Sequence, residues 1–147
     1  MAIKETSHGG WSAARSRPRT TELLAGALLA AMAAIHLLVY FGFQLTFGYP
    51  GALFVINAVA AVLIGAGVLG GLRPAWHLAA LFAAGTIAAF FVVHTVGLPG
   101  FYLPDWVEMV GPLPLGPLSL AVEAALLLTY AWSFSSRPSS AHPARTA

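Results

Sequence analysis

The sequence contains no cysteine, which excludes disulfide bonds, thiol redox chemistry and thiolate metal sites. Only 8% of its residues are charged, whereas a soluble domain carries about 25%. It also lacks the P-loop, G-x-S-x-G and H-E-x-x-H motifs that accompany ATP hydrolysis, serine hydrolysis and zinc proteolysis. These absences predict a membrane protein with no recognisable catalytic motif.

Hydrophobic residues make up 59% of the chain and gather in four nearly uncharged runs. Runs of about 18 or more such residues predict transmembrane helices. The expected spans cover about residues 23–47, 52–72, 75–96 and 118–134, with turns at Tyr49-Pro50-Gly51 and at Arg73-Pro74. Because short turns join consecutive spans, we expect an all-α fold, an antiparallel bundle of four transmembrane helices.

The two ends of the chain differ in composition from these runs. Residues 1–21 are polar and basic, and residues 135–147 are rich in Ser, Pro and Ala, so both are expected to be disordered tails. The membrane domain accordingly covers residues 22–134. Its first run resembles a signal peptide but is longer than the usual 7–15 or so apolar residues, which favours an uncleaved helix.

The placement of basic residues predicts the topology. All seven Lys and Arg residues lie in the two tails or at Arg73, and with four spans these segments share one side of the membrane. By the positive-inside rule that side is the cytoplasm. The loop of residues 97–117 contains Asp105 and Glu108, expected in water, and no basic residue, so it is expected outside. We therefore expect a multi-pass plasma-membrane protein with both termini in the cytoplasm.

Each expected helix carries one strongly polar side chain in its outer half. These residues are His36, Asn57, His94 and Glu123. Residues four apart share a helix face, and further polar residues extend the stripes or lie at neighbouring levels: Tyr40 and Gln44 in the first span, Thr86 and Thr95 in the third, and Ser119 in the fourth. Because a carboxylate facing lipid costs a few kcal/mol, Glu123 is expected inside the bundle.

Three hypotheses account for this polar layer. In the first, its side chains form a structural hydrogen-bond network between helices, as in an accessory or structural membrane protein without a cofactor. In the second, His36, His94 and Glu123 bind a divalent metal ion or relay protons. In the third, His36 and His94 hold haem b, although their depths differ by roughly a helical turn or more. The sequence favours the first and leaves the other two open.

Several short motifs carry a resemblance to known sequences. They are R-x-x-W at residues 73–76, T-x-G-L-P-G at 95–100, an acidic loop with Trp106, and P-L-x-x-x-S-L-x-x-E ending at Glu123. Together they resemble an uncharacterised group of small four-span membrane proteins from high-GC Gram-positive bacteria. The resemblance covers about residues 23–134. It implies the fold and topology and implies no reaction.

Expected partners follow from the same features. The lipid bilayer is the first, and nothing indicates nucleic-acid binding. The second span contains Gly65, Gly67, Gly70 and Gly71, and small residues let helices approach closely, so this helix is the expected contact in a homo-oligomer. The outer loop is the expected docking surface for a membrane or extracytoplasmic protein.

Overall fold

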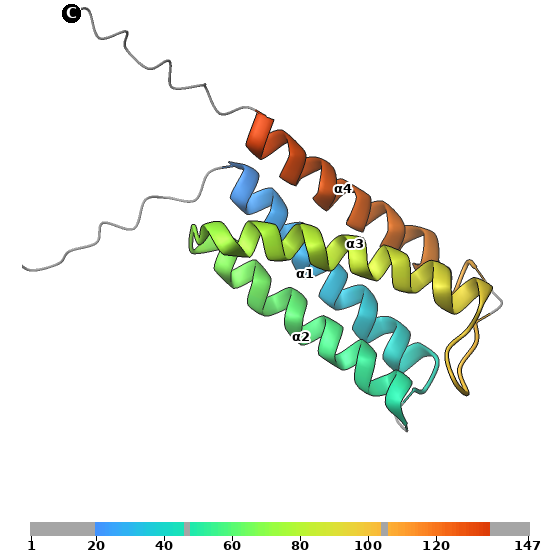
Figure 1. Cartoon of the computed structure of the whole chain (residues 1–147). Helices are drawn as coiled ribbons and strands as arrows, with labels where there is room; N and C mark the ends of the chain where they lie inside the picture. Colours follow the sequence, from blue (N-terminus) through green and yellow to red (C-terminus); the bar gives the residue numbers. More distant parts are fainter. Residues whose placement is uncertain (1–19, 46–47, 104–105, 136–147) are drawn as a thin grey trace, which may run out of the picture.

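The computed structural model describes residues 20–45, 48–103 and 106–135, and this part of the chain is almost entirely helical (Figure 1). Its elements are α1 (Thr20–Gly42), α2 (Tyr49–Leu69), α3 (Arg73–Thr95), β1 (Met109–Val110), β2 (Leu113–Pro114) and α4 (Leu115–Ser135). The two short strands form an antiparallel hairpin. All four helices are long and apolar enough to cross a membrane. The predicted all-α, four-transmembrane-helix bundle is confirmed.

The helices run up and down in sequence order around a square. Helix α1 packs against α2 and α4, and α3 packs against the same two helices. The start of α1, the α2–α3 turn and the end of α4 lie together, and we call this the terminal end (Figure 1). The connection from α1 to α2 and the segment between α3 and α4 lie at the opposite end, called the loop end.

Two helices begin earlier than their prolines suggested. Tyr49-Pro50-Gly51, expected to be a turn, is instead the first turn of α2, and Arg73 likewise begins α3. A separate turn at Tyr49-Pro50-Gly51 was therefore a wrong expectation, whereas Pro74 lies in the first turn of α3, where its missing N–H would be unpaired anyway. The actual α2–α3 turn is formed by residues 70–72, where Gly71 has a φ of 73°.

The first helix is shorter than the apolar run that forms it. It ends at Gly42 rather than at Phe47, which lies outside the described residues. Gln44 follows it with a φ of 53°, a left-handed conformation that cannot continue a helix. Gln44 is therefore not on the polar stripe that the spacing from His36 predicted.

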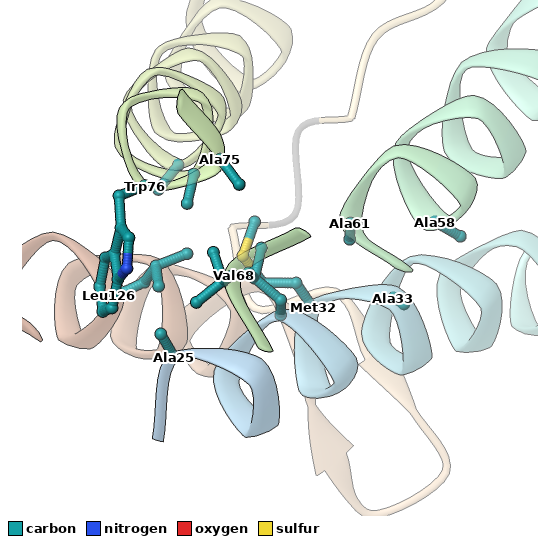
Figure 2. Packing of buried hydrophobic residues seen from close by; sticks show 12 residues of the cluster. Ala25, Met32, Ala33, Ala58, Ala61, Val68, Ala75, Trp76 and Leu126 are labelled. Atoms are coloured by element: carbon teal, nitrogen blue, oxygen red, sulfur yellow. The ribbon is translucent and has the colours of Figure 1, made fainter. Parts of the chain in front are cut away.

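The main core fills the half of the bundle nearer the terminal end. Seven of its twelve buried residues are alanines, and Trp76 of α3 lies beside Leu126 of α4 (Figure 2). Small side chains let the helix backbones approach closely and make many dispersion contacts. A second and smaller cluster lies toward the loop end, where Ile35, Val39 and Leu115 are buried.

The glycines of α2 serve this internal packing. A Cβ at Gly67 would lie 2.9 Å from the Cβ of Ala75, and one at Gly65 would lie 3.5 Å from the Cβ of Leu29. Both positions therefore face neighbouring helices of the same chain. The predicted homo-oligomer, for which this helix was the expected contact, stays a prediction.

Candidate functional site: a cavity toward the loop end

A cavity of about 110 Å³ lies between the helices toward the loop end. All four residues of the predicted polar layer line it, one from each helix: His36, Asn57, His94 and Glu123. Other polar lining residues are Thr86 of α3, Ser119 of α4 and Glu108 of the segment between α3 and α4. The structure thus brings the four predicted residues together around one space.

His94 pairs with a carboxylate that arrives from the loop. Its Nε2 lies 3.1 Å from Oε1 of Glu108, and both side chains are buried. Its Nδ1 lies 2.7 Å from the carbonyl oxygen of Phe90. Because a carbonyl only accepts, Nδ1 must carry the hydrogen that is donated there. Nε2 is close enough to the Glu108 oxygen for an ion pair when the ring is protonated, but it makes no hydrogen bond within the described residues.

The segment that carries Glu108 is fixed to the start of α4. The backbone N–H groups of Leu115 and Gly116 donate to the carbonyls of Glu108 and Val107, at 3.2 and 3.1 Å. These donors belong to the first turn of α4, where backbone N–H groups have no partner within the helix. A Cβ at Gly116 would lie 2.4 Å from the carbonyl oxygen of Trp106, so the close approach requires glycine.

Glu108 itself corrects an expectation from sequence. It was predicted to lie in water with Asp105, which is outside the described residues, but it is only 6% exposed. Its φ of 47° is unusual for a residue with a side chain, and such strain is often found at functional sites. The signal was absent from the sequence because the burial depends on His94 and on the hairpin fold of the loop.

Glu123 is the most deeply buried ionisable group of the layer, with 1% exposure. Its Oε1 accepts a hydrogen bond of 3.0 Å from the Ser119 hydroxyl. Its Oε2 has no hydrogen-bond partner in the described part of the chain. Thr86 and Glu108 lie near enough to interact with the carboxyl group, but the Thr86 hydroxyl is 3.0 Å from carbonyl oxygens of its own helix and donates there.

His36 also lines the cavity and carries an acceptor nitrogen. Its Nδ1 lies 2.8 Å from the carbonyl oxygen of Met32, and by the argument used for His94 it donates its hydrogen to that oxygen. In the neutral ring Nε2 then keeps a lone pair that can accept a hydrogen bond. The ring is buried and tilted against Phe54, 5.8 Å between centroids.

Besides Gln44, Thr95 and Tyr40 were predicted near the layer and do not line the cavity. The Thr95 hydroxyl donates to the carbonyl oxygen of Phe91 at 2.6 Å and is exposed. Tyr40 packs edge-on against Phe41, 5.0 Å between ring centroids. The side-chain hydrogen bonds of His36, His94, Thr95 and Ser119 run within single helices, and the interhelical network of the first hypothesis stays a prediction.

Metal and haem binding can be compared with this geometry. Within residues 20–45, 48–103 and 106–135, no group of three His, Cys, Asp or Glu side chains is placed to hold a metal ion. Each histidine donates from Nδ1, an arrangement that also occurs in metal-bound histidines. However, the cavity holds only a few water molecules, and Nε2 of His94 already contacts Glu108. A haem group does not fit between His36 and His94 in this packing.

No protein-family model matches the chain, and comparisons with curated proteins and with solved structures find no match. The resemblance to small four-span proteins of high-GC Gram-positive bacteria therefore stays an expectation.

Proposed function

We propose that this chain is a small integral membrane protein that binds a cation, with the proton as the smallest case, in the cavity toward the loop end. The observation that carries the proposal is the Oε2 atom of Glu123, which is buried and has no partner among the described residues. A buried carboxylate without a partner is costly, and it is stabilised by a proton or a cation. Glu123 lines a cavity in which such a cation has room.

The alternative favoured by the sequence, an accessory protein with a structural polar layer, receives less support. That role needs side chains that join helices, and polar side chains do so by interhelical hydrogen bonds. The hydroxyl of Ser119 and the imidazoles of His36 and His94 instead bond within their own helices. The cross-element contact of His94 goes to Glu108 in the loop.

The distribution of packing favours binding over conduction. The cavity occupies the half toward the loop end, while the half toward the terminal end is filled by the alanine-rich core. A bound cation would therefore enter and leave from the same side. With Arg73 and the basic tails in the cytoplasm, as the positive-inside rule indicates, that side is the outer face of a plasma membrane.

The test is the effect of Glu123→Gln on stability, measured by reversible unfolding of the purified protein in mixed micelles. Glutamine keeps an acceptor for Ser119 and replaces the charged oxygen without a partner by a neutral amide. An unsatisfied buried group costs about 1–3 kcal/mol, so we expect the variant to be as stable as the wild type or more stable.

The matched control is Glu22→Gln, which removes the same charge in the first turn of α1. It should change the free energy of unfolding by at most about 1 kcal/mol, through the helix dipole. If Glu123→Gln were destabilising by clearly more than this control, Glu123 would be a folding residue and the proposal would be wrong.

A further inference from the structure

The polar atoms of the cavity are mainly acceptors. Oε2 of Glu123 accepts and has no hydrogen-bond partner among the described residues, and Nε2 of His36 is an acceptor because Nδ1 of that ring carries the hydrogen. The side-chain oxygen of Asn57 is a third acceptor on the lining. The Ser119 hydroxyl already donates to Glu123. No Lys or Arg lines the cavity, so its complement is a positively charged ligand that carries hydrogen-bond donors.

The remaining walls are apolar and partly aromatic. Phe54, Phe90 and Phe101 come from α2, α3 and the loop, and aliphatic side chains fill the spaces between them. Such walls disfavour a strongly hydrated metal ion, which needs several oxygen or nitrogen ligands. They suit an alkyl group, and aromatic rings also attract an organic cation.

The volume limits the size of the ligand. The cavity measures about 110 Å³, and an apolar protein cavity of roughly 150 Å³ binds benzene, which has six heavy atoms. A ligand of only a few heavy atoms therefore fits, whereas polyamines and bulky quaternary ammonium ions do not.

We infer that the cavity binds a small alkylammonium ion, whose N–H groups donate to Oε2 of Glu123 and Nε2 of His36 and whose alkyl group contacts the phenylalanine rings. This inference rests on the proposed function and narrows it from cations in general to a chemical class. Charge and size both favour this class: an anion would face the carboxyl groups of Glu108 and Glu123, a neutral molecule leaves the Glu123 carboxylate uncompensated, and a larger cation exceeds the cavity.

The experiment uses the full chain labelled with 5-fluorotryptophan and titrated in micelles with ethylammonium chloride, observed by fluorine NMR. Trp106 is the reporter, since its ring lies 5.3 Å from that of His94 and 5.9 Å from that of Phe90. Its signal is assigned among the four tryptophans with Trp106→Phe. We expect a saturable shift with ethylammonium and none with sodium chloride, ethanol or tetrabutylammonium.

Glu123→Gln should weaken the binding of ethylammonium at least about tenfold, since it removes a charge-assisted hydrogen bond. Glu22→Gln should leave binding unchanged. An equal response to ethanol and ethylammonium, or no response to either, would overturn the alkylammonium inference. If the alkylammonium inference failed in this way but Glu123→Gln did not destabilise the protein, the proposed cation site would stand. If the titration gave no specific response to ethylammonium and Glu123→Gln were also strongly destabilising, both proposals would be wrong.

Discussion

The two halves of this bundle solve the packing problem in opposite ways. Toward the terminal end, alanines such as Ala79 and Ala83 are fully buried and form part of the main hydrophobic core. Toward the loop end, the helices enclose a cavity and bury His36, His94 and Glu123. The first half contributes stability through close contacts. The second contains groups that are costly to bury, as expected for a binding site in a membrane protein.

The largest expected effect comes from adding the same side chain to each half of α3. Ala83→Leu places a large group in the fully packed half and should destabilise the protein by about 1–3 kcal/mol, because overpacking forces the neighbours apart. Ala89→Leu adds the same side chain at an exposed position on the cavity lining. It should lower the free energy of unfolding by clearly less than Ala83→Leu does. Unfolding in mixed micelles measures both changes. Equal losses would mean that the two halves do not differ in packing.

A smaller effect is expected for the pair that joins α3 to the loop. In a double-mutant cycle of His94→Gln and Glu108→Gln, the coupling energy should be about 1–2 kcal/mol, because each change leaves the other group buried without its partner. A cycle of His77→Gln with Glu108→Gln is the control. His77 bonds to the Tyr130 hydroxyl at 2.9 Å, so its coupling to Glu108 should be near zero. A similar coupling in both cycles would refute a specific His94–Glu108 contact.

The smallest effect is expected at Thr95, a residue that the sequence assigned to the polar layer. Its hydroxyl is exposed and bonds to its own helix, so Thr95→Ala should change the free energy of unfolding by less than about 0.5 kcal/mol. Ser119→Ala removes the donor to Oε1 of Glu123 and should cost about 1 kcal/mol. Chemical denaturation compares the two, and a larger loss at Thr95 would place it in the layer after all.

Hydropathy alone was sufficient to predict four spans, because uncharged runs of this length have few alternatives in a protein. Topology and helix rise then identified His36, Asn57, His94 and Glu123 as polar groups in the same half of the bundle, and all four line the cavity. The order of the helices around the square followed from the short connections between consecutive spans.

The partners of these groups could not be predicted in the same way. The contact of Glu108 with His94 depends on a loop hairpin and on one left-handed residue, and neither has a local signature in the sequence. His36 and His94 each donate from Nδ1 to the carbonyl oxygen one turn earlier in their own helix instead of to a side chain of another helix. The spacing of residues in the sequence does not reveal which of these two partners a histidine takes. The orientation of the bundle in the membrane stays a prediction from the basic residues.

The most direct measurement of the central claim is the carboxyl carbon resonance of Glu123 in protein labelled with carbon-13 at the glutamate side-chain carboxyl. The chain has four glutamates, and Glu-to-Gln variants assign the signals. If Glu123 is the cation site, its resonance shifts saturably when ethylammonium is added, while that of Glu22 stays in place. A Glu123 resonance that remains as constant as that of Glu22 through the whole titration would contradict a cation site for this ligand in the cavity.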